Sequence, residues 1–202
     1  MSKQTINIAL DIETLSTRPT AAIIEIAAQS FSFAGNQPID REGPLYLLVN
    51  ASTCAMYGFH FDMETVNWWA SQPDEVKIFN KNCTSASESI KSVLLSLKYY
   101  IDDLKRKYPD SELLVWCQGT DFDIPILRNA YQVVFGTDVP WPHDCVRDAR
   151  TFVHSVYGLH GKDDGNPYDL IPKNPDWQPH NPLSDCEQLI WNVRHAIMDF
   201  AG

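Results

Sequence analysis

Continuous and alternating apolar residues in the first quarter of the chain predict three β-strands. Residues 6–10 form an apolar run that predicts a buried strand, which ends on the polar step Asp11-Ile12-Glu13-Thr14. Apolar and polar positions alternate over residues 21–33, and residues 45–49 are again mostly apolar. Because the three predicted strands follow one another with short connections, we expect an antiparallel meander.

The rest of the chain shows mainly helical periodicity, interrupted by one short apolar run at residues 113–117 that predicts a fourth strand. Asn181 fits a helix cap and Pro182 a first helical position, so they mark the start of the last helix. This order predicts an α/β fold in which helices flank a mixed central sheet. The expected helices lie at residues 62–71, 85–107, 120–134, 146–157 and from residue 182 onward.

Composition favours one domain over residues 1–202. The chain is 44% hydrophobic, and its 13 prolines and 9 glycines are scattered rather than collected into a linker. The polar N-terminus does not fit a secretory signal, and no apolar run is long enough to span a membrane, so we expect a cytoplasmic location. The five cysteines are an odd number without C-x-x-C spacing, which argues against disulfide frameworks and zinc sites.

The net charge of −10 narrows the function classes. Proteins that coat nucleic acid rely on Lys and Arg to bind phosphate, so an acidic chain argues against that class. It does not argue against a metallonuclease, because carboxylates that hold divalent cations form a locally neutral cluster.

Acidic residues from three separate segments are candidates for such a cluster. Asp11 and Glu13 are two positions apart on a strand, so their side chains point to the same side. Asp123 lies where a strand gives way to a helix, and His180 and Asp185 frame the start of the last helix. Taken singly, each group has an ordinary explanation. The pair on the strand fits a solvated strand end, and Asp123 fits a helix entrance that Asp121 is better placed to cap. His180 and Asp185 fit a surface histidine near a helix-start aspartate. Taken together, they are oxygen ligands suited to Mg²⁺ or Mn²⁺, with a histidine available as general base.

The ordered set of motifs resembles that of DEDD exonucleases. The first motif is Asp11-Ile12-Glu13-Thr14 followed by residues 21–27, and the second is Phe122-Asp123 with Leu127. The spacing from His180 to Asp185 matches the third motif of the DEDDh, or DnaQ-like, branch. Within that branch, residues 65–69, 118–127 and 147–151 are similar to phage exonucleases of the DexA type and to RNase AS-like proteins.

The resemblance implies a ribonuclease-H-like fold and a metal-dependent 3′→5′ exonuclease that releases nucleoside 5′-monophosphates from single-stranded DNA. One alternative is an exoribonuclease that acts on RNA 3′ ends, and a second is a catalytically inactive nucleic-acid-binding module. The resemblance leaves a homodimer open and points to a bacterial or phage-infected cell, with no membrane partner. It implies that two Mg²⁺ or Mn²⁺ ions bind Asp11, Glu13, Asp123 and Asp185, and that His180 is the general base.

The resemblance also implies that the backbone at Thr14 and Leu15 contacts the terminal nucleotide, and that Leu15 packs on its base. Trp68 is a candidate stacking face for an unpaired base, and because adjacent helix positions point apart, Trp68 or its neighbour Trp69 should belong to the core.

Two arginines and one glycine complete the expected surroundings of the site. Arg147 and Arg150 are three positions apart on an expected helix face and are candidates to hold a phosphate, the alternative being ion pairs with acidic residues. By the same resemblance, Gly119 stands where many relatives carry Asn, which leaves open whether this chain makes the corresponding polar contact to the substrate.

Overall fold

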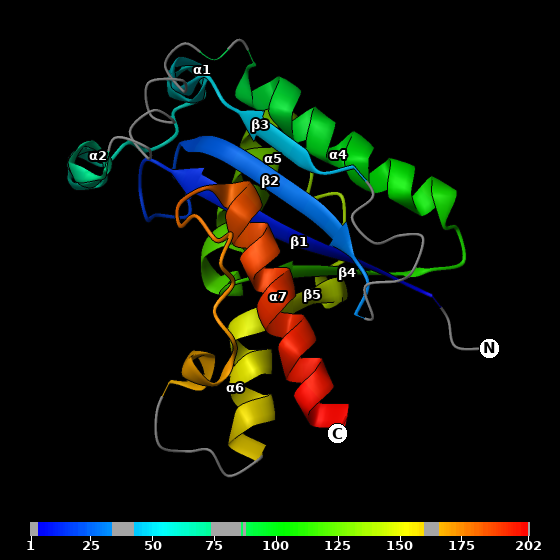
Figure 1. The fold of residues 1–202 in the computed structure, drawn as a ribbon. Coiled ribbons are helices and arrows are strands. Elements are labelled where there is room, and N and C mark those ends of the chain that lie inside the picture. Colours follow the sequence, from blue (N-terminus) through cyan, green and yellow to red (C-terminus); the bar gives the residue numbers. More distant parts are fainter. Residues whose placement is uncertain (1–3, 34–42, 74–85, 87, 160–165, 202) are drawn as a thin grey trace.

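The computed structural model describes residues 4–33, 43–73, 86, 88–159 and 166–201, and in this part of the chain one mixed sheet forms the centre of the molecule (Figure 1). β1 and β2 pair antiparallel, as do β2 and β3, which confirms the predicted meander. β1 and β4 pair parallel, as do β4 and β5. The strands, in the spatial order β3-β2-β1-β4-β5, are β1 (Thr5–Thr14), β2 (Ile23–Phe31), β3 (Leu45–Leu48), β4 (Glu112–Cys117) and β5 (Val146–Asp148).

Helices cover both faces of the sheet. Figure 1 shows α4 and α5 on one side, and α6 and α7 on the other. The long helix α4 buries an apolar stripe that includes Val93, Leu97 and Ile101. The helices are α1 (Ala51–Met56), α2 (Met63–Ser71), α4 (Ile90–Lys107), α5 (Thr120–Phe135), α6 (Ala149–Leu159) and α7 (Pro182–Ala201), with short 3₁₀ turns η1 (His143–Cys145) and η2 (Pro167–Leu170).

The two faces of β1 have different neighbours. Ile8, Leu10 and Ile12 belong to the hydrophobic core that includes α4 and α5, whereas Ala9 packs with residues of α7. Because side chains alternate along a strand, Asp11 and Glu13 share the face of Ala9. The strand therefore directs both carboxylates toward the start of α7.

Three features of the fold differ from the sequence-based prediction. The first strand is not limited to the apolar run at residues 6–10. It continues through the polar step to Thr14, because Glu13 still pairs with Glu25 of β2. The helix expected over residues 146–157 begins only at Ala149, since the three preceding residues pair with β4 as β5. The six-residue helix α1 was not predicted at all.

Some expectations fall partly on residues outside the described part of the chain, including Cys83 and the first residues of the helix expected at 85–107. The other four cysteines are buried and free.

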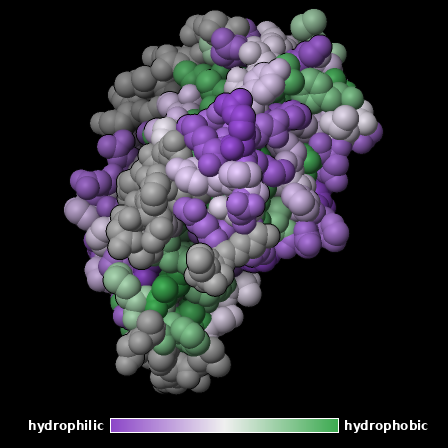
Figure 2. Space-filling model, turned by 90° about the vertical axis from the view of Figure 1, so that its right-hand side faces the viewer, coloured by the Kyte–Doolittle hydropathy of each residue, from purple (hydrophilic) through white to green (hydrophobic). Residues whose placement is uncertain are grey.

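The surface shown in Figure 2 is mixed. Hydrophilic residues dominate its middle, and hydrophobic residues gather toward its lower end. The C-terminal end of α7 lies at the bottom of Figure 1, and it exposes Met198 and Phe200. Among the described residues, no helix is both long enough and apolar enough to cross a bilayer.

Candidate active site

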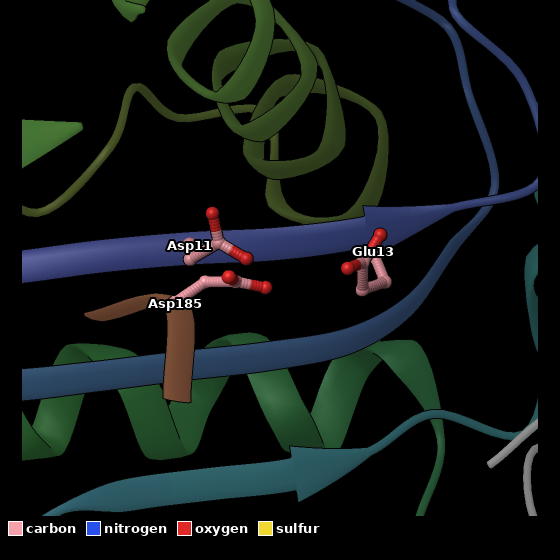
Figure 3. Close-up of side chains that lie close together, drawn as sticks. All are labelled: Asp11, Glu13 and Asp185. Atoms are coloured by element: carbon pink, nitrogen blue, oxygen red, sulfur yellow. The ribbon is translucent and has the colours of Figure 1, made fainter. Parts of the chain in front are cut away.

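Three carboxylates converge above one face of β1. Asp11 and Glu13 project from this strand and Asp185 from the first turns of α7 (Figure 3). One ligand oxygen from each lies within 4.8 Å of the others, so a single divalent cation can reach all three. The predicted convergence of residues far apart in the sequence is therefore present for these three side chains.

Asp123 lies beside this group without belonging to it. Its side chain is buried in the first turn of α5, and one carboxylate oxygen accepts a hydrogen bond of 3.3 Å from the backbone amide of Ile12. It nevertheless lines the same cleft as Asp11 and contributes the strongest charge repulsion on that residue. The structure thus places Asp123 at the edge of the cluster, with part of its bonding capacity used by the β1 backbone.

The entrance of α5 is capped by a residue other than Asp121. Gly119 occupies the N-cap position with a φ of 105°, and has no side chain to cap with. Asp148 supplies the missing acceptor, because its carboxylate accepts from the amides of Thr120 and Thr151, both at 2.7 Å. The expectation that Asp121 caps this helix is therefore wrong: Asp121 lies inside the first turn, and the cap comes from β5.

Burial and mutual repulsion favour protonated carboxyls in the cluster. Burial is the main cause that raises the pKa of Asp11 well above its ordinary value, followed by the charges of Asp123 and Glu13. Burial, then the charge of Asp185, raises the pKa of Glu13 to about 9. Burial also raises the pKa of Asp123 to about 7. At neutral pH the cluster therefore holds protons that a divalent cation would replace, which fits a metal site built from hard oxygen donors.

Trp177 orients one of these carboxylates, and the sequence pattern did not identify it. Its indole Nε1 donates a hydrogen bond of 2.7 Å to Asp185. Burial raises the pKa of Asp185, and the hydrogen bond from Trp177 is the first of the effects that oppose this rise. Trp177 lies in an irregular stretch before α7, where no periodicity could point to it.

Glu25 is a further acidic residue next to the cluster, and it too was not singled out as a site residue. It is buried in β2 directly opposite Glu13 and accepts a hydrogen bond of 2.9 Å from the hydroxyl of Tyr46. Burial raises the pKa of Glu25 to about 7, and its charge in turn raises the pKa of Glu13.

His180 lines the same cleft and is held by two tryptophans. Its φ of 63° is left-handed, a conformation that costs free energy in a non-glycine residue. Its ring packs edge-to-face against Trp68, with centroids 4.9 Å apart, and more distantly against Trp69 at 6.0 Å. The indole of Trp69 also donates to the carbonyl of Thr14 at 2.9 Å.

The two tryptophans take different positions, as the sequence predicted. Trp69 is 3% exposed and belongs to the core, whereas Trp68 is 43% exposed and presents a face to solvent. Thr14 is buried and its hydroxyl donates to the carbonyl of Ser16 at 2.7 Å, while Leu15 is partly buried against the core. Trp68 thus has the accessibility that base stacking requires.

The two arginines do not share a helix face. Arg147 belongs to β5, and its guanidinium donates to the carbonyls of Asp144 and Val146 at 2.7 and 2.9 Å. Arg150 lies in the first turn of α6, donates to the carbonyl of Gln118 at 3.1 Å, and lines the same cleft as Asp11 and His180. Within the described part of the chain, neither arginine forms an ion pair with an acidic residue.

Gly119 gives Arg150 the space to approach. A Cβ at position 119 would come within 3.1 Å of the Arg150 Nη2 atom, closer than ordinary packing allows. The guanidinium therefore occupies the space into which a side chain at position 119 would project.

The cleft that these residues share, the candidate catalytic cleft, is a cavity of about 430 Å³ lined by acidic side chains and by the cationic Arg150. Its residues include Asp11, Glu13, Asp123, Arg150, His180 and Asp185.

Comparison with known proteins supports the fold and assigns a family. Residues 6–197 match the family model described as the 3′-5′ exoribonuclease Rv2179c-like domain. Comparison with curated protein sequences gives no match.

Solved structures of exonucleases share the fold. The nuclease domain of 3′hExo, described as a DEDDh family member bound to rAMP, has a TM-score of 0.66 at 14% identity, covering 98% of this chain and 94% of that one. Exonuclease I in a complex described as ExoI/SSB-Ct has a TM-score of 0.62 at 14% identity, covering 98% of this chain and 43% of that one. E. coli Exonuclease I with a 5cy-dA13 oligonucleotide has a TM-score of 0.59 at 16% identity, with 95% and 41% covered. The present chain thus corresponds to less than half of these Exonuclease I chains.

Proposed function

The chain belongs to the family of 3′-5′ exoribonuclease Rv2179c-like domains, and from that membership we propose that it removes nucleotides one at a time from the 3′ end of single-stranded RNA. It is a 3′-5′ exonuclease with a DEDDh-type, ribonuclease-H-like fold. The products of the proposed reaction are nucleoside 5′-monophosphates and a strand shortened by one residue.

The observation that carries the proposal is the meeting of acidic residues from β1, α5 and α7 in one cleft with a histidine. We assign two Mg²⁺ or Mn²⁺ ions to Asp11, Glu13 and Asp185, with Asp123 at the edge of the group. Bound divalent ions supply stabilisation of the attacking and leaving oxygens in phosphoryl displacement.

The remaining roles fall to residues of the cleft wall. His180 accepts the proton of the attacking water, and its edge-to-face contact with Trp68 keeps the imidazole at the cleft. Arg150 binds a phosphate oxygen of the substrate, while Arg147, whose guanidinium is committed to two backbone carbonyls, has a lesser part. The backbone at Thr14 and Leu15 and the exposed face of Trp68 receive the terminal nucleotide.

RNA is the first proposed substrate and DNA the second, which reverses the order expected from the sequence. The family description names an exoribonuclease, and the 3′hExo structure contains a ribonucleotide. Single-stranded DNA is the second candidate, because Exonuclease I, which shares the fold, is described with a dA13 oligonucleotide. We also propose that residues 1–202 form a single nuclease domain, since the family match spans almost all of them.

The experiment is digestion of matched 5′-labelled RNA and DNA strands, single and double, with Mg²⁺, Mn²⁺ or EDTA. We expect the single RNA strand to be cut fastest, EDTA to abolish cutting, and Asp11→Asn to remove nearly all turnover. Asp110→Asn, at an exposed turn away from the cleft, is the matched control. Faster cutting of DNA would reverse the substrate order. Binding of the strand without turnover at any metal concentration would favour the inactive binding module instead.

A further inference from the structure

A second cavity of about 490 Å³ adjoins the catalytic cleft. The two cavities share the side chains of Asp11, Gln118, Trp177 and Asp185, so anything bound in one lies next to the other. Away from the cleft, the second cavity extends along α7 and toward η2. The residues that define its chemistry are Gln118, Tyr168, Ile171, Trp177, Gln188 and Asn192.

Two side-chain amides in this cavity are incompletely bonded. Gln118 donates to the hydroxyl of Tyr168 at 2.6 Å, and Gln188 donates to the side-chain oxygen of Asn192 at 2.9 Å. The other end of each glutamine, the Oε1 atom, is buried without a hydrogen-bond partner. Because buried polar atoms are almost always paired, two unpaired amide oxygens on residues that line one cavity are candidates for pairing with a polar ligand.

The remaining walls suit a flat, partly apolar ligand. Trp177 is 45% exposed and stands between the two cavities, while Ile171 is buried and Tyr168 half-buried. Asn192, which is only 5% exposed, accepts the hydrogen bond from Gln188 and so fixes the position of that side chain. Aromatic and aliphatic walls with convergent amides are the features that bind nucleobases, whereas phosphate binding calls for Arg and Lys. Lys173, the single lysine or arginine among the described residues that line this cavity, is exposed.

The position of the cavity along the substrate follows from the direction of β1. The carboxylates lie between two regions: Thr14 and Trp68 beyond Glu13, and the second cavity on the Asp11 side. In a 3′→5′ exonuclease the scissile phosphodiester joins the terminal nucleotide to the penultimate one. If the terminal nucleotide lies near Thr14, the penultimate nucleotide lies on the opposite side of the carboxylates.

We propose that this second cavity binds the base of the penultimate nucleotide. The proposal rests on the exonuclease function proposed above and adds to it a second nucleotide-binding subsite. Gln118 and Gln188 hydrogen-bond the edge of the base, and the side chains of Tyr168 and Trp177 provide flat surfaces against it. The enzyme therefore grips the strand on both sides of the bond that it cuts.

The test compares 5′-labelled strands of one sequence that carry a single abasic nucleotide at the penultimate, terminal or sixth position from the 3′ end. The first hydrolytic step is measured with the unaltered protein. We expect the penultimate abasic residue to lower kcat/KM for this step by about tenfold or more, and the abasic residue at the sixth position to have no effect. Equal kcat/KM for the penultimate abasic strand and the unmodified strand would overturn the subsite. No cutting of the unmodified strand would instead overturn the exonuclease proposal itself.

A variant links the effect to the cavity. Gln188 lines the second cavity but not the catalytic cleft, so Gln188→Leu leaves the proposed metal ligands in place. It should lower kcat/KM on the unmodified strand about three- to tenfold and leave the penultimate abasic strand unaffected. Gln132→Leu, at an exposed position of α5, is the control. An equal loss on both strands would assign Gln188 a structural role and contradict the subsite. The substrate comparison with the unaltered protein decides the question even if the variant does not fold.

Discussion

His180 combines an unfavourable backbone conformation with close aromatic packing. Among the described residues it is the only one other than glycine with a positive φ. The left-handed conformation costs free energy, and the contacts with Trp68 and Trp69 help to hold it. Backbone strain of this kind gathers at functional sites, which agrees with a role for the imidazole in the cleft.

The first prediction separates a general base from a metal ligand. We expect His180→Ala to lower single-turnover hydrolysis by about 10²- to 10⁴-fold. Metal affinity measured by calorimetry on the same variant should stay nearly unchanged, because the three grouped ligand atoms are all carboxylate oxygens. His143→Ala, at an exposed position, is the control. Loss of affinity together with rate would make His180 a ligand, and an unchanged rate would leave it without a catalytic role.

At the residue scale, motif spacing and strand alternation identify some of the site residues. Residues that contact the site from other segments of the chain, without a motif of their own, are missed. Asp11 and Glu13 were predicted because alternation along a strand places them on one side. Trp177 could not be predicted, since it reaches Asp185 from an irregular segment. The same holds for Glu25, whose effect on Glu13 arises from pairing between strands.

At the scale of elements, one aspartate joins two helices to the sheet. Asp148 ends β5 and accepts hydrogen bonds from the first turns of both α5 and α6. Burial alone would raise the pKa of Asp148, but the hydrogen bonds from Thr151 and Thr120 outweigh it and lower the pKa below its ordinary value. This contact fixes the start of α5, the turn that carries Asp123.

The second prediction follows from this double cap. We expect Asp148→Ala to lower the free energy of unfolding by about 1–3 kcal/mol, since each helix loses a capping acceptor. Chemical denaturation measures the loss, with the exposed Asp110→Ala as control. A loss equal to that of the control would show that water replaces the carboxylate at both helix starts.

The elements that the sequence failed to predict are the short ones. β5 has three residues and α1 has six, and neither is long enough to display a period. Both depend on tertiary contacts. β5 pairs with β4, and α1 packs against α4 and β2. The longer elements, β2, α4 and α7, carry enough periodic positions to be predicted from pattern alone.

At the scale of the whole molecule, a small group of buried acidic residues makes stability depend on pH. Asp11, Glu13, Asp123 and Glu25 all have pKa values raised by burial. A group whose pKa is higher in the folded than in the unfolded state stabilises the fold below the unfolded pKa. That stability is lost as pH rises through the folded pKa.

The third prediction is therefore a decline in stability of the metal-free protein as pH rises from about 5 to about 9, the window between the ordinary carboxyl pKa and the raised value of Glu13. Thermal unfolding in EDTA measures it, with a shift of about 2–4 °C for each kcal/mol lost. Mg²⁺ should restore the midpoint, and Glu13→Gln should flatten the decline. A midpoint independent of pH, or the same slope in Glu13→Gln, would contradict the raised pKa values.

The full strand order of the sheet could not be predicted from the sequence. The meander of β1, β2 and β3 follows from short connections, but nothing in the pattern indicates that β4 adds to the other side of β1 in parallel. That choice depends on long-range pairing. It matters for function, because it brings Gln118 and α5 to the carboxylates.

The central claim is that these carboxylates serve metal-dependent removal of nucleotides from a 3′ end. The most direct measurement is the product pattern from a 5′-labelled linear single strand, a 3′-blocked strand and a closed circular strand, each with Mg²⁺ at neutral pH. We predict a ladder that shortens by one nucleotide at a time from the linear strand, with the blocked and circular strands intact. Internal cuts in the circular strand, or shortening of the linear strand that persists in EDTA, would contradict it.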